Sequence, residues 1–375
     1  MTEVTESRAR EIFQSRADQH SKKVVENVQK LQDIVTNIND FTIDDYSRYG
    51  FGMDGRKIIF GEKNNLNAPI YSFHQNALQQ FASKVKVPLD YANRLTDTDW
   101  GRALLNSMLN EHLTHFPKER SLIRSVNLGV DHDSREIRGF LSDRYKRLET
   151  GQIFQQFLSS MQLIEPRSFL YDAYVSDTRS WIDVMIPELF TTETEKNGKV
   201  WFVMGARMSS SDFGDGAFQL QTYMINIVCN NGMTRQTMLR EVHLGAKLPP
   251  TIHFSDTTHK LDTATTISKT KDIISHSFSN ATIMEQINGI YQATEIIIDP
   301  KNELSRIQTL SKGEKELILD ELIANNPEHG VQGENSAWKL AMAMTWVGNT
   351  LDSRRQKEIN EISGDFINTK LGIKN

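Results

Sequence analysis

Two strand-like runs between Val200 and Met233 constrain the fold more than any other part of the chain, because they bracket a small polar loop rich in glycine. Apolar runs separated by glycine-containing turns predict neighbouring β-strands. Further strand-like runs lie at Lys57–Phe60, Ser121–Gly129, Arg135–Leu141, Phe169–Val175 and Ser180–Ile186. Their short links predict a mostly antiparallel sheet of roughly six to eight strands.

A long helix is predicted before these strands. The stretch from Glu6 to Ile38 contains no proline or glycine, and its apolar residues follow steps of four and three, as in a heptad seam. The seam consists of Val24, Val28, Leu31, Val35 and Ile38. Because it lasts only about two heptads, packing on its own domain and self-association into a homo-oligomer both stay open.

Other helices are predicted from apolar residues at helical spacing. They cover His74–Val85, a short segment with Tyr91 and Leu95, Trp100–His115, Thr150–Met161, Thr263–Tyr291, Lys312–Ala324 and Ser336–Asn368. Ser255–Thr266 is predicted to be a linker. The sequence therefore predicts an α+β fold in three parts: an N-terminal helix (1–40), an α+β core (41–255) and a helical C-terminal region (256–375).

Composition narrows the classes of function. A formal charge of −5 and a pI near 6.1 argue against coating nucleic acid through overall charge, so any polyanion site has to be a local patch. The single cysteine, Cys229, can form no intrachain disulfide, which favours a reducing, cytoplasmic location. The polar N-terminus and the lack of a long apolar stretch predict no export signal and no membrane partner.

The sequence carries no signature of catalysis. Its ten histidines lack metal-ligand spacing, and no nucleophile triad or phosphate-loop motif occurs. Separated acids such as Asp172 and Asp183 give no reason to expect a two-metal site. We therefore expect no catalytic residue, metal or cofactor, and keep a nucleotide-processing enzyme only as the weakest alternative.

Three motifs carry a resemblance to a known family. They are Gly139-Phe-Leu-Ser-Asp-Arg-Tyr-Lys-Arg-Leu148, Gly205-Ala-Arg-Met-Ser-Ser-Ser-Asp-Phe-Gly214 and Val228-Cys-Asn-Asn-Gly-Met233. In order and spacing the chain resembles a phage/plasmid-like protein family that is catalogued as a domain of unknown function. That family has Ser-Asn-Ser-Glu-Val-Gly in the middle motif, where this chain has Ser209-Ser-Ser-Asp-Phe-Gly214.

The resemblance implies a mobile genetic element as the setting, and so nucleic-acid metabolism, replication support or evasion of host defence. It implies no particular activity. In outline, strand-strand-helix units followed by a helical C-terminal region are also similar to phage single-strand annealing proteins. Fold-level similarity of this kind does not assign a function by itself.

Basic residues with neighbouring aromatics form the predicted binding site. Phosphates pair with cationic side chains, while bases stack on aromatic rings, and both features suit a single strand. We predict phosphate contacts from Arg138, Arg144, Lys146 and Arg147, and base stacking on Tyr145 and Phe213. The loop residues Arg207, Ser209 and Ser210, together with Arg235 and Arg240, are predicted to complete one groove. A salt-bridged strand edge and a plain hairpin loop explain the same residues without a ligand.

These observations predict a cytoplasmic phage or plasmid protein that binds nucleic acid, namely single-stranded DNA during replication or recombination, without catalysis. Its partners would be a single strand and further copies of the chain. The alternative is an interaction protein that inhibits or redirects a host protein. In that case the long helices and the acidic C-terminal region would form the contact surface.

Overall fold

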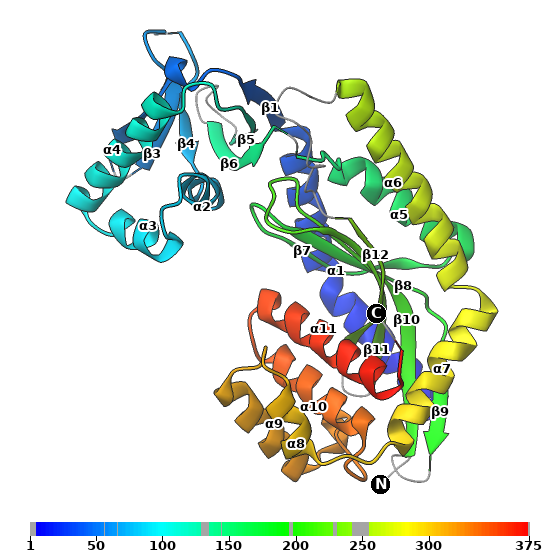
Figure 1. Cartoon of the computed structure of the whole chain (residues 1–375). Helices are drawn as coiled ribbons and strands as arrows, with labels where there is room; N and C mark the ends of the chain where they lie inside the picture. Colours follow the sequence, from blue (N-terminus) through cyan, green and yellow to red (C-terminus); the bar gives the residue numbers. More distant parts are fainter. Residues whose placement is uncertain are drawn as a thin grey trace.

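The computed structural model describes residues 5–55, 57–65, 67–128, 135–143, 145–194, 198–227, 231–241 and 255–373. It confirms the α+β class, since helices pack on two mostly antiparallel sheets (Figure 1). The first sheet and its helices form one lobe, and the second sheet lies between that lobe and the C-terminal helices α8 to α11. Among the described residues, no helix is long and apolar enough to cross a membrane.

The first sheet belongs to the N-terminal half of the chain. Its strands are β1 (Ile38–Ile43), β2 (Tyr49–Asp54), β3 (Lys57–Glu62), β4 (Tyr71–Phe73), β5 (Ser121–Asn127) and β6 (Arg135–Ser142). They lie in the order β1-β5-β6-β4-β3-β2, and only β4 and β6 pair in parallel. Helices α2 (Gln75–Lys84), α3 (Leu89–Thr96) and α4 (Asp99–His115) belong to the same lobe, as does the short helix η1 (Tyr46–Arg48). Aromatic residues such as Phe60, Phe81 and Phe140 fill its core.

The second sheet contains the strand pair predicted from Val200–Met233. Its strands are β7 (Phe169–Val175), β8 (Ser180–Met185), β9 (Phe190–Thr194), β10 (Gly198–Ser210), β11 (Phe218–Asn226) and β12 (Asn231–Glu241). They lie in the order β12-β11-β10-β8-β7, with β9 also paired to β10, and every pair is antiparallel. The predicted count of roughly six to eight strands was too low, since the described residues form twelve strands in two sheets. Short strands such as β1, β4 and β9 give little periodic signal.

Helix α1 (Glu6–Thr36) packs within its own chain. Thr5 caps it by accepting a hydrogen bond from the Arg8 N–H, and the helix runs along β7. Its first turns pack Ala9 and Phe13 against aromatic residues of the second sheet, and its later turns enter a core shared with α5 (Thr150–Ile164). The heptad residues Val24 and Leu31 are buried there. Val28, Val35 and Ile38 are half-buried against the same core, so the seam packs on the protein's own domain.

Helix α9 has its predicted bounds, but two longer C-terminal helices are divided in the structure. The helices of this region are α6 (Asp256–Ser277), α7 (Asn280–Glu295), α8 (Pro300–Arg306), α9 (Lys312–Ala324), α10 (Ala337–Asn349) and α11 (Ser353–Lys370), with η2 at Pro327–His329. Two predicted long helices are split, because Ser279 caps the start of α7 and Asp352 caps the start of α11. The predicted linker at Ser255–Thr266 is instead the capped first part of α6.

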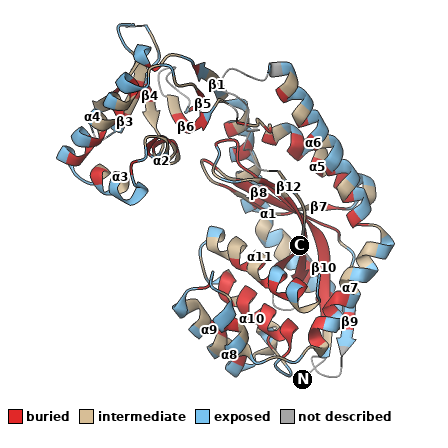
Figure 2. Ribbon diagram, viewed as in Figure 1, coloured by how far each residue is buried: buried red, intermediate tan, exposed pale blue. Residues whose placement is uncertain are grey.

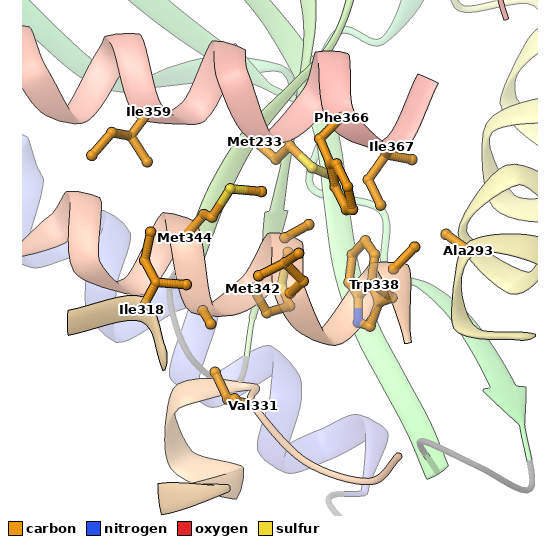
Figure 3. Close-up of a cluster of buried hydrophobic side chains, with 14 of the residues drawn as sticks. Met233, Ala293, Ile318, Val331, Trp338, Met342, Met344, Ile359, Phe366 and Ile367 are labelled. Carbon is orange, nitrogen blue, oxygen red and sulfur yellow. The ribbon is translucent and has the colours of Figure 1, made fainter. Parts of the chain in front are cut away.

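The helices after residue 255 share a hydrophobic core with the second sheet. Trp338 and Met342 of α10 and Ile367 of α11 lie in one cluster with Met233 of β12 (Figure 3). Figure 2 shows this buried interior continuing along β10 and β8. The predicted boundary near residue 255 thus separates two segments of sequence, while in space the helices beyond it complete the core of the second sheet.

Helix α11 approaches β12 closely at Gly364. A Cβ atom added at this glycine would lie 1.5 Å from the Thr234 carbonyl oxygen, so the helix would have to move away from the strand. We expect Gly364→Ala to lower the free energy of unfolding by about 1–3 kcal/mol, as overpacking does. Urea denaturation measures the change.

A second helical glycine provides the matched control. Gly313 of α9 has open space around its Cβ position, so Gly313→Ala should leave stability unchanged or raise it by up to about 1 kcal/mol. Equal behaviour of the two alanine variants would contradict the close contact between α11 and β12.

Candidate nucleic-acid interface

Three cations of the predicted basic run near Arg138 have carboxylate partners. The Arg138 Nε lies 2.8 Å from the Glu136 carboxylate, and its Nη1 donates to the Asp177 carbonyl. Lys146 lies 3.3 Å from Glu241, and Arg147 lies 3.9 Å from Asp40. Arg144 is outside the described residues. Arg138 is also buried, so strand burial and ion pairing explain most of this run.

The two predicted stacking rings are inside the protein. Tyr145 is 6 % exposed and Phe213 is 2 % exposed. The Tyr145 hydroxyl donates to the Ser211 carbonyl, while the Phe213 carbonyl accepts hydrogen bonds from Asn76 and Gln80. The prediction that these rings stack on bases is therefore wrong for this structure, because a base cannot reach them.

The polar loop after β10 is a junction between the two sheets. Arg124 of β5 is 1 % exposed and contacts three carboxylates, those of Asp40, Glu149 and Asp212. Its Nη1 also donates to the Asp212 carbonyl at 3.0 Å. Burial raises the pKa of Asp212 to about 6, although Arg124 opposes the shift. The loop that was predicted to suit phosphate therefore uses its polar groups to join the two sheets.

Two of the motifs behind the family resemblance meet at this junction. A Cβ atom on Gly139 would lie 3.3 Å from the Phe213 backbone, and one on Gly214 would lie 2.6 Å from Leu141. Gly214 also has a φ of 72°, a left-handed conformation that favours glycine. Close packing at Gly139 and the turn at Gly214 both require a small residue. The glycines of these two motifs therefore have a structural explanation.

Arg207 forms a buried ion pair with Asp183. Its Nε and Nη2 donate to the two carboxylate oxygens at 2.6 and 2.7 Å, across neighbouring strands. The guanidinium also lies over the Tyr223 ring, 4.1 Å from its centroid. Because both charged side chains are at most 4 % exposed, the predicted phosphate contact from Arg207 was wrong.

Four cations instead converge on a cavity of about 270 Å³ beside α11. Arg240 comes from β12, Arg354 and Lys357 from α11, and Arg179 from the turn before β8. Ser209 and Ser210 also line it, together with Trp181 and two carboxylates, Glu358 and Glu361. Three predicted residues, Ser209, Ser210 and Arg240, therefore lie at one site.

Three of the four cations have carboxylate partners: Arg179 lies 2.9 Å from Asp215, Arg354 lies 3.7 Å from Glu358, and Lys357 lies 3.3 Å from Glu361. Arg240 leaves one positive charge in excess. Lys357 also donates to Ser209, yet its pKa is lowered, first by burial and also by Arg207 and Arg179. Arg240 is exposed, and no carboxylate of the described chain forms an ion pair with it. An anion entering the cavity would relieve this repulsion between cations.

The predicted single groove is divided among three cavities that share no lining residue. Arg147 lines one of about 370 Å³ with His259 and Lys260, and Arg235 lines another of about 490 Å³. Arg240 belongs to the cavity beside α11. Sequence reasoning missed Arg179, Arg354 and Lys357, although the three-residue spacing of Arg354 and Lys357 on one predicted helix places both on one face.

No protein-family model, curated protein or solved structure matches this chain. The resemblance to a phage/plasmid-like family and the outline similarity to annealing proteins therefore stay predictions. Within the described residues, no three or more His, Cys, Asp or Glu side chains are grouped so that they could hold a metal ion. Cys229 lies outside those residues.

Proposed function

We propose that the protein binds single-stranded nucleic acid through the cavity formed by Arg179, Arg240, Arg354 and Lys357. The observation that supports this proposal most is the convergence of four cations from three separate segments in a chain with a net charge of −5. Phosphate oxygens pair with guanidinium and ammonium groups and give affinity without sequence preference. Phage or plasmid replication or recombination is the setting that the family resemblance suggests.

The size of the cavity favours a flexible strand over a duplex. A space of about 270 Å³ can take a phosphate that is pushed inward, which a single strand can do by bending. A duplex holds its phosphates on a stiff, convex surface. Trp181 lines the cavity but is 4 % exposed and stacked on Tyr174, so base stacking contributes little. We therefore expect weak sequence preference and strong dependence on salt.

Charge reversal tests the cavity directly. The double variant Arg240→Glu and Arg354→Glu should lower affinity for a labelled oligothymidine at least about tenfold at low salt, since two phosphate pairings become repulsive. Fluorescence anisotropy against salt concentration should also show a smaller slope, by about 0.7 for each phosphate that the variant no longer neutralises.

Arg94 provides the control. It lies on α3 in the other lobe, is exposed and, like Arg240, has no ion pair within the described chain. Arg94→Glu should leave the affinity for oligothymidine nearly unchanged. Absence of binding by the wild type at low salt, or equal losses in both variants, would contradict the proposal.

The alternative of a protein-binding role is favoured by a different surface. Trp100 is 68 % exposed and Leu104 is 39 % exposed, and their four-residue spacing places both on one face of α4. Exposed aromatic and aliphatic side chains of this kind are typical of protein contacts. If wild-type protein retains no oligonucleotide at low salt, this face of α4 becomes the better candidate for function.

A further inference from the structure

Arg235 is a buried arginine that forms no ion pair with a carboxylate of the described residues. It lies on β12, is 3 % exposed, and its Nη1 has no hydrogen-bond partner within the described chain. Its Nε donates to Gln286 of α7 at 3.2 Å. Burying a charge without a partner is costly, and most buried arginines are paired with a carboxylate, as Arg207 and Arg124 are here.

Arg235 lines a cavity of about 490 Å³ between β12, α6, α7 and α11. Gly289 of α7 lies beside it, and a Cβ atom there would come within 3.0 Å of the Arg235 Nη2. The glycine therefore leaves room for the guanidinium at this position. Asn368 of α11 donates to the Arg235 carbonyl at 2.7 Å, which fixes the backbone from the other side.

The other residues that line the cavity indicate which kind of ligand would fit. Asp272 and Glu285 also line the cavity, are exposed, and form no ion pair with Arg235. The pKa of Arg235 is lowered to about 10 by burial alone, so neither carboxylate offsets its charge. Apolar atoms come from Met238, Ile273 and Ile373. A dianionic phosphate would be repelled by these two carboxylates. A zwitterion can pair its negative group with Arg235 and its positive group with the carboxylates.

We propose that this cavity binds a small zwitterion of the α-amino acid class, whose carboxylate pairs with Arg235 and whose ammonium group faces Asp272 and Glu285. The site shares no lining residue with the cavity that contains Arg240. It therefore does not depend on nucleic-acid binding, and either proposal can fail alone.

Calorimetric titration of the full chain with L-leucine and with L-lysine tests this proposal. We expect at least one of them to bind at millimolar concentration, and acetate or butylamine, each carrying half of the charge pattern, to bind at least tenfold more weakly. Arg235→Met should reduce binding at least tenfold, and Asp272→Asn should reduce it less. Arg94→Met serves as the control and should bind like the wild type.

Thermal unfolding without ligand gives a second readout. Because Arg235→Met removes an unpaired buried charge and keeps an unbranched side chain, its melting temperature should equal or exceed that of the wild type. The proposal is overturned if neither amino acid binds, if Arg235→Met binds as well as wild type, or if acetate alone binds as tightly. A lower melting temperature of the variant would assign Arg235 a structural role and also count against the proposal.

Discussion

Replacing Arg207 by methionine is expected to lower the free energy of unfolding by about 3–5 kcal/mol, because the change leaves Asp183 buried without its partner. Asp183 is 1 % exposed and cannot recover solvation by a small movement. Urea denaturation at neutral pH measures the loss. If the variant were as stable as the wild type, the buried pair would not exist in solution.

The pH dependence of the same variant has a definite sign. Burial already raises the pKa of Asp183, and loss of Arg207 would raise it further. The folded variant then binds a proton more tightly than the unfolded chain does, so its stability falls as pH rises through the raised pKa. The free energy of unfolding that the variant loses relative to the wild type should therefore become smaller as pH falls from about 7 to about 4.

A double replacement provides the control. Arg207→Met combined with Asp183→Leu removes both charges, and apolar pairs in such positions are often as stable as the ion pair they replace. Recovery of most of the lost stability would assign the effect to the unpaired carboxylate. No recovery would mean that Arg207 acts through its packing on Tyr223 instead.

Replacing Arg124 by methionine is the second change with a large expected effect, again about 3–5 kcal/mol of unfolding free energy. Three carboxylates face this guanidinium, and without it Asp40, Glu149 and Asp212 repel one another at the junction between the sheets. Arg8→Met is the control, since the Arg8–Glu11 pair is exposed and worth less than about 1 kcal/mol. Similar small losses in both variants would contradict the role of Arg124.

The Arg207 and Arg124 variants also test whether these arginines stabilise the fold without contributing to binding. At temperatures where they are folded, the Arg207 and Arg124 variants should keep the wild-type affinity for oligothymidine. The sequence alone could not make this distinction, because Arg207 and Arg124 lie in strand-like runs, Arg240 follows such a run, and all three have acids nearby in sequence. The partner of Arg207 lies 24 residues away on an adjacent strand. Only the pairing of β8 with β10 shows that the two charges meet.

Local patterns did predict most elements. Apolar spacing predicted the extent of α2, α4 and α9 closely, and the strand-like run Lys57–Phe60 lies within β3. Such signals lie within one element and its caps. The division into two sheets, and the approach of α11 to Arg179 and Arg240, depend on packing between distant segments. Periodicity contains no information about that packing.

Helix α1 can complete its packing only after much later parts of the chain have been synthesised. Its Phe13 ring stacks on Tyr171 and shares a cluster with Trp201, residues that a ribosome makes long afterwards. The other end of the helix leads directly into β1, which pairs with β5. Long sequence separation between contacting segments slows folding, and apolar surface stays exposed until the later segment is available. The apolar side of the segment that becomes α1 therefore stays uncovered until the second sheet has been synthesised.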